Sequence, residues 1–143
     1  MSDAISAFGT LLKMGDGGTS ESFTTIAEVS DIKGPKLSLD PIDVTNHSSA
    51  EAWREFVGGL LDAGEVSLSI NFMPADATHD YSTGIISKLT DRGKHNFQMV
   101  FPDDGNTTWS FTALVTAFES SEPIDDKLAA DVTLKITGKP TLA

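Results

Sequence analysis

The chain has 143 residues and no cysteine, and its 21 acidic side chains outnumber its 10 basic ones to give a formal net charge of −11. This length corresponds to about one domain, and the missing cysteines exclude disulfides and thiolate chemistry. The negative charge disfavours binding to nucleic-acid phosphates or to anionic membrane surfaces.

The first twenty residues contain neither a basic segment nor a long apolar run, so we expect no signal peptide there. No stretch of the chain approaches the ~18 apolar residues that span a membrane. Residues 15–20 are too rich in glycine for a packed element. We expect an N-terminal arm with a short strand at residues 10–14, although a frayed terminus explains the same composition.

Strand signals follow at residues 23–29 and 36–39, where Pro41 interrupts the second pattern. Residues 45–64 have the composition of a long loop, polar at first and then containing Gly58 and Gly59. Four apolar side chains in this segment are costly to leave in water: Trp53, Phe56, Leu60 and Leu61. Their spacing suits one face of a short helix, or a neighbouring subunit covers them. We favour the second explanation.

The next segments have clearer periodicity. Residues 65–72 alternate between apolar and polar side chains, which is typical of a half-buried strand. A helix is expected from Thr78 to Arg92, capped by Asp76 or Thr78, with Tyr81, Ile85 and Leu89 on its apolar stripe.

Further strands are expected at residues 95–101, 107–118 and 128–137, with a hairpin turn at 102–106. One helix and about seven strands make a mainly β fold. We expect an antiparallel sandwich or open barrel with one flanking α-helix.

The candidate chemical sites are weak. His47, His79 and His95 lack the spacing of metal ligands, and the acidic turn at 103–106 lacks the later ligand of a calcium loop. No serine elbow, phosphate-binding loop or dinucleotide motif occurs. We therefore expect no enzyme activity, no metal and no cofactor.

The polar face of the expected strands is a different kind of candidate. Its side chains are small and mostly uncharged, and they include Ser67, Ser69, Asn71 and Gln98. Such a face is either an ordinary solvated side of an antiparallel sheet or the lining of a pore.

An ordered series of short motifs between Ile26 and Phe72 carries a family resemblance. It reads IAEVSDIKGP at 26–35, LSLD at 37–40, IDVT at 42–45, WREF at 53–56, GGLLDAGE at 58–65 and VSLSINF at 66–72. This series resembles the major tail tube protein of long-tailed (siphovirus, lambda-like) bacteriophages, and the resemblance covers residues 8–136. It implies the phage tail tube fold, which is similar to the inner tube of type VI secretion.

The resemblance implies a structural virion protein that is assembled in the bacterial host cytoplasm. Six subunits would form a ring, and stacked rings would form a hollow tail tube that conducts the genome. The implied partners are other copies of the chain, the tape-measure protein, and the tail terminator and tail tip proteins. DNA would pass through the lumen without specific binding, and no membrane would be involved.

The resemblance also divides the chain and assigns candidate residues. It implies a flexible arm at 1–20, a β-sandwich domain at 21–138 with a stacking loop at 40–64, and a tail at 139–143. The ring-stacking candidates in the loop are Asp43, Trp53, Arg54, Glu55, Phe56 and Leu60. Lys33, Lys36 and Arg54 are candidates for charge pairs between subunits, and Ser67, Ser69, Asn71 and Gln98 are candidates for the lumen.

Two other function classes remain open from the sequence. One is the inner-tube subunit of a secretion system, which gene neighbourhood would distinguish from a phage tube. The other is a small β-sandwich binding module. That module would need an exposed aromatic cluster, whereas Trp109 is placed for the core.

Overall fold

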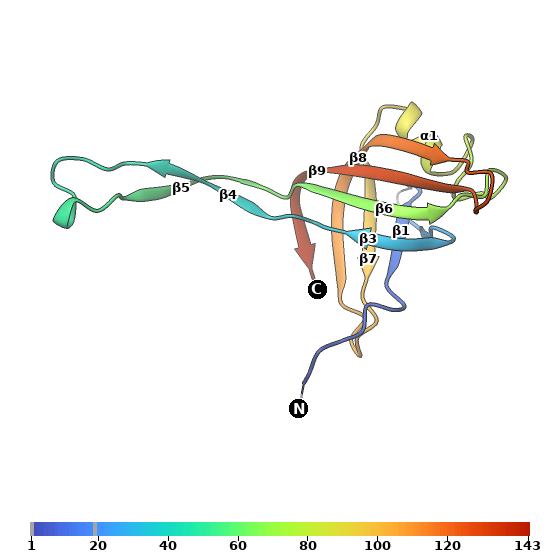
Figure 1. Ribbon diagram of the computed structural model, residues 1–143, viewed down its shortest axis with the longest axis horizontal. Coiled ribbons are helices and arrows are strands. Elements are labelled where there is room, and N and C mark those ends of the chain that lie inside the picture. Colours follow the sequence, from blue (N-terminus) through green and yellow to red (C-terminus); the bar gives the residue numbers. More distant parts are fainter. Residues whose placement is uncertain (1, 19) are drawn as a thin grey trace.

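The computed structural model describes residues 2–18 and 20–143, which form a β-sheet body and a long projecting hairpin (Figure 1). The described part of the body is one seven-stranded sheet with the order β2-β1-β7-β8-β9-β6-β3. Every pairing in it is antiparallel. Its strands are β1 (Leu11–Gly15), β2 (Phe23–Thr25), β3 (Val29–Lys33), β6 (Glu65–Asn71), β7 (His95–Val100), β8 (Thr108–Ser121) and β9 (Ala129–Leu142). The body is therefore mainly β, as the sequence predicts.

The sheet curls because its two longest strands bend. The pairing of β8 with β9 shifts register between Ser110 and Thr112 and again between Val115 and Ala117, and such bulges bend a strand. Figure 1 shows β3, β6 and β9 crossing the direction of β1 and β7. The inward side chains of these strands form a single apolar core. The sandwich or open barrel expected from the sequence is confirmed.

The predicted helix is much shorter in the structure. The α-helix α1 spans Ile85–Thr90, and Ile85 is fully buried while Leu89 packs against the core. Residues 76–84 are turns instead of helix because Asp80 Oδ1 accepts hydrogen bonds from the Thr83 and Gly84 amides at 2.7 and 2.9 Å. Such local bonds compete with helix formation. The expected apolar contact of Tyr81 is wrong, since its side chain is 70% exposed.

The segment expected to be a long loop is instead an ordered hairpin. Strand β4 (Ser38–Asp43) pairs with β5 (Phe56–Asp62), and a short 3₁₀ helix, η1 (Ala50–Ala52), lies near the turn. Pro41 sits within β4 opposite Gly58, which a two-stranded ribbon tolerates because outward-facing amides need no partner strand. The alternative of a helix around residues 53–61 is wrong, because β5 occupies that segment.

Two further expectations differ from the structure. The strand expected at 23–29 is two strands, β2 and β3, at opposite edges of the sheet. Between them, Ile26 is buried and Glu28 adopts φ 57°. The short strand expected near the N-terminus appears as β1, whose Leu12 is fully buried. Strand β9 continues to Leu142, so the sheet extends beyond both ends of the domain expected at 21–138.

Candidate functional site

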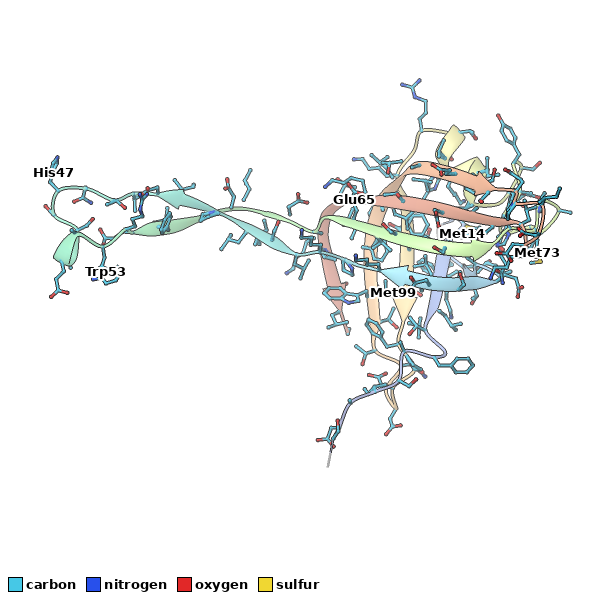
Figure 2. The ribbon with its side chains drawn as sticks, viewed as in Figure 1. Met14, His47, Trp53, Glu65, Met73 and Met99 are labelled. Carbon is cyan, nitrogen blue, oxygen red and sulfur yellow. The ribbon has the colours of Figure 1, made fainter. Side chains whose placement is uncertain are left out.

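The β4–β5 hairpin is the most exposed apolar feature of the described chain. It extends far from the body, and Trp53 and His47 lie at its outer end (Figures 1 and 2). All six residues of β4 are exposed. On and beside β5, Trp53, Leu60 and Leu61 are 72%, 85% and 81% exposed. A two-stranded hairpin alone is marginally stable in water, so another surface that covered these apolar side chains would stabilise it.

Polar side chains organise the outer end of the hairpin, residues 43–55, which we call the tip. The Asp43 carboxylate accepts a hydrogen bond from the Thr45 amide at 2.9 Å, and the Thr45 side chain and amide lower the pKa of Asp43. The Glu55 amide donates to the Thr45 hydroxyl at 2.8 Å, and the Glu55 carboxylate accepts from Ser49 at 2.6 Å. Arg54 lies 3.5 Å from Asp43. The structure thus brings three predicted stacking residues, Asp43, Arg54 and Glu55, together.

The Arg54–Asp43 pair lies within one hairpin. Both side chains are largely exposed, and exposed pairs of this kind contribute about 0–1 kcal/mol. Arg54 therefore already has a weak partner in its own subunit, and the predicted pairing with another subunit would compete with that contact.

Close approach of the two strands depends on glycine. A Cβ atom added at Gly59 would lie 2.8 Å from the Asp40 carbonyl oxygen and 3.1 Å from Ile42 Cδ1. A Cβ atom at Gly58 would lie 3.5 Å from the Leu39 side chain, an ordinary contact, so the close approach depends on Gly59. The predicted stacking residues Phe56 and Leu60 flank this glycine pair on β5. The hairpin therefore presents leucine and aromatic side chains on a thin ribbon.

An apolar groove lies where the hairpin joins the body, and we call it the base groove. Its volume is about 780 Å³. The hairpin contributes Leu37, Leu39 and Leu61, and the body contributes Trp109 and Leu142 among others. The groove was not predictable from the sequence, because no local pattern joins residues so far apart in the chain.

The candidate lumen residues divide into two groups. Ser67, Ser69 and Asn71 alternate along β6 with the buried Val66, Leu68 and Ile70, so they face away from the core. Gln98 lies on β7, which β8 and β9 separate from β6 in the sheet. Because the core lies between the two halves of the curled sheet, the outer face of β7 and the outer face of β6 point in different directions. The structure therefore brings three of the four candidates together.

The face around Ser69 also carries acidic side chains from the neighbouring strands. Asp31 on β3 and Asp131 on β9 are opposite Ser69, and Glu119 on β8 is opposite Asp131. The Ser69 hydroxyl donates a hydrogen bond to Asp131 at 2.8 Å. We call Asp31, Ser69, Asp131 and Glu119 the acidic row. The sequence could not reveal it, because it depends on which strands are neighbours.

Lysines surround the base of the hairpin. Lys33 is the last residue of β3 and is opposite Ser67, and Lys36 lies against Gly64 where the hairpin begins and ends. Lys139 lines the base groove. Within the part of the chain that the structure describes, none of these three forms an ion pair. They are therefore available to acidic groups of another molecule.

His79 and His95 make polar contacts within the fold. His79 is fully buried, where its Nδ1 accepts a hydrogen bond from the Met73 amide at 3.0 Å and its Nε2 lies 2.7 Å from the Ala27 carbonyl oxygen. His95 lies 2.9 Å from Asp91. Among residues 2–18 and 20–143, no group of three or more metal-ligating side chains occurs. No helix in this described part is both long enough and apolar enough to cross a membrane.

The comparisons with known proteins identify a family and a fold. A family model described as "Lambda phage tail tube protein, TTP" matches residues 11–143. No curated protein sequence matches the chain.

Solved structures share the fold of this chain. The tail of an empty gene transfer agent particle, refined with C6 symmetry, superposes with a TM-score of 0.79 at 22% identity and covers 98% of this chain and 99% of that one. A structure of the sheath/tube terminator of PVC, an extracellular contractile injection system, in its extended state gives 0.74 at 14% identity, covering 100% and 99%. The SPP1 tail tube gives 0.65 at 12% identity, covering 93% and 74%.

Proposed function

This chain belongs to the lambda phage tail tube protein family, and we propose that its subunits form six-membered rings that stack into a hollow tube for the phage genome. It is a structural protein of the virion, located in the phage tail. The family membership rests on a match to residues 11–143, which include every strand from β1 to β9. The ring size follows the C6 symmetry of the similar gene transfer agent tail.

The observation that carries the assembly proposal is the unpartnered hairpin. Leu60 and Leu61 are more than four-fifths exposed, and Trp53 and Phe56 are more than half exposed. Monomeric proteins rarely expose a continuous apolar surface of this kind, and such a surface usually marks a protein interface. In the proposed tube the hairpin of one ring contacts the next ring, and burial of these side chains stabilises the stack.

A second part of the proposal concerns the channel. We assign the outer face of β6, with Ser67, Ser69 and Asn71, to the lumen. The acidic row supports this assignment, because a basic lining would hold DNA through its phosphates by counterion release. Carboxylates repel the phosphates instead, so the genome slides. The tape-measure protein would occupy this channel during assembly, and terminator and tip proteins would close the two ends of the tube.

Negative-stain electron microscopy of the purified protein, at rising concentration, tests the assembly proposal. We expect rings and tubes with a central hole. The matched variant lacks residues 48–58, which are most of the tip and the first three residues of β5. We expect it to remain folded, by circular dichroism and thermal melting, and to form no long tubes. Long tubes from the folded deletion variant would refute the stacking role of the hairpin.

The channel assignment is tested with Ser69→Lys/Asn71→Lys in reconstituted tails. We expect tubes to assemble but genome ejection to slow, with the defect easing as salt rises, because salt screens the lysine–phosphate attraction. A matched control is Gln98→Lys, on the other outer face. Normal ejection by the double variant at low salt would show that these residues do not face the channel.

A further inference from the structure

The base groove is an apolar receptor that its own subunit leaves empty. Leu37, Leu39 and Leu61 on the hairpin side are each more than half exposed, and so is Leu142 on the body side. The groove opens at the end of the core, since Trp109 packs against the core and Ile136 beside it is buried. A ligand in this position would therefore extend the hydrophobic core and leave water on entry.

The hairpin tip carries an apolar group of suitable size. Trp53 follows η1 at the outer end of the hairpin and is 72% exposed (Figure 2). The η1 backbone presents it there, because the Trp53 amide donates to the Ala50 carbonyl oxygen at 3.0 Å and Ala52 adopts φ 63°. Tryptophan in a fully desolvated pocket is among the residues that contribute most to protein binding.

Charge favours the meeting of these two regions. At the tip, Asp43 is paired with Arg54, which leaves Glu51 and Glu55 as the acidic groups without a basic partner in the described chain. Lys139 lines the base groove and Lys36 lies nearby against Gly64, while Asp62 in the same lining is paired with Lys135 at 3.5 Å. Opposite charges on the rims of a contact increase its rate of formation and fix its orientation.

The tip cannot enter the groove of its own subunit. The paired strands β4 and β5 hold Trp53 away from Leu39 by roughly 24 Å, at ~3.4 Å per strand residue. The hairpin tip and the base groove are different surfaces of one chain. The contact between them is therefore of the head-to-tail kind, which repeats from copy to copy without closing into a dimer. A stack of rings needs this geometry.

We propose that the occupant of the base groove is the hairpin tip of a second copy, with Trp53 inserted against Trp109, Leu39 and Leu142 and with Glu51 facing Lys139. This inference rests on the proposed tube and names the receptor for its stacking hairpin. The chain offers one competing occupant, the N-terminal arm, whose Phe8 is 92% exposed.

Disulfide trapping tests this contact directly, because the natural chain has no cysteine. The test variant is Ala50→Cys/Ser38→Cys, which places one thiol beside Trp53 and one in the groove wall without altering the apolar anchors. The matched control is Ala7→Cys/Ser38→Cys, which reports the arm beside Phe8. Full-length proteins are assembled, oxidised mildly and separated on a non-reducing gel. Disulfides need Cα atoms within about 7 Å, and Ala50 and Ser38 of one chain are far beyond it.

We expect a ladder of covalent multimers from the Ala50→Cys/Ser38→Cys tubes and monomers from the arm control. Tubes that give no ladder, or a ladder from the arm control alone, would overturn the assignment of the tip and leave the tube proposal standing. Natural protein that forms no rings or tubes would overturn the proposed function itself, and this contact with it.

A charge exchange gives a second result that does not depend on thiols. Lys139→Glu and Glu51→Lys should each raise the concentration needed for assembly by about 2- to 10-fold, as expected for a rim charge pair replaced by like charges. The double exchange should restore most of the natural value. If the single variants are impaired and the double variant is no better, Glu51 does not face Lys139 and the proposed contact is wrong.

Discussion

Leu60→Ser separates the stability of the subunit from the stability of the tube. Leu60 is 85% exposed in the free subunit, so replacing it removes little that stabilises the folded chain. Full burial of a leucine side chain contributes about 1.5–3 kcal/mol. Covering the exposed 85% in a ring contact would therefore contribute about 1.3–2.5 kcal/mol per subunit. Losing it raises the critical concentration for polymerisation about 10- to 70-fold.

The critical concentration is measured by sedimenting tubes and assaying the soluble protein, and the midpoint of unfolding is measured in urea. We expect Leu60→Ser to raise the critical concentration and to leave the urea midpoint nearly unchanged. The control is Leu134→Ala at a fully buried core position, which should lower the free energy of unfolding by about 2–5 kcal/mol. A critical concentration for Leu60→Ser within twofold of the natural one would refute the burial of this side chain in the tube.

Three further predictions concern the free subunit. His79→Leu leaves the Met73 amide and the Ala27 carbonyl oxygen without their buried partner. Urea denaturation should therefore show that the free energy of unfolding falls by about 2–6 kcal/mol, at ~1–3 kcal/mol per group. The control variant His47→Ala, at the exposed tip, should show no such loss. Gly84→Ala should lower the thermal midpoint and shift the turn before α1, because its Cβ would clash with the Asp80 backbone nitrogen; an unchanged midpoint would show that this turn adjusts freely. Hydrogen bonds from the Thr107 side chain and amide lower the pKa of Asp103. The contribution of Asp103 to the free energy of unfolding is therefore complete above its ordinary pKa of 3.8 and is lost as the pH falls toward the lower pKa of the folded state. The free energy of unfolding should fall less steeply from pH ~6 to ~2 in Asp103→Asn, and equal slopes would contradict this linkage.

The sequence predicted the strands that bury one face. Residues 65–72 and 95–101 alternate clearly because β6 and β7 each pack one side on the core and leave the other in water. The same rule found only the start of β4 at residues 38–39 and missed the rest of β4 and all of β5, since apolar residues such as Ile42 and Leu61 occur on a ribbon without a buried side. Pro41 and Gly58 also read as breakers, although they are paired within the hairpin.

The candidate site was predictable only in part. The unusual cost of Trp53, Phe56 and Leu60 in a loop indicated an intersubunit surface, and those residues lie on the exposed hairpin. The acidic row and the base groove were not predictable, because each is formed by strands that are distant in the chain. The start of the helix was also mistaken, since carboxylates at Asp76 and Asp80 bond to nearby amides and favour turns.

The composition of the base groove has a consequence during synthesis of the chain. The hairpin, with its apolar tip, leaves the ribosome early, and its two strands pair locally. The groove wall formed by Pro140 and Leu142 belongs to β9, the last strand to be made. In the proposed stacking contact, a growing chain would therefore expose the hairpin tip before its own base groove is complete. Neighbouring partial chains on one polysome would then carry tips without finished grooves to receive them.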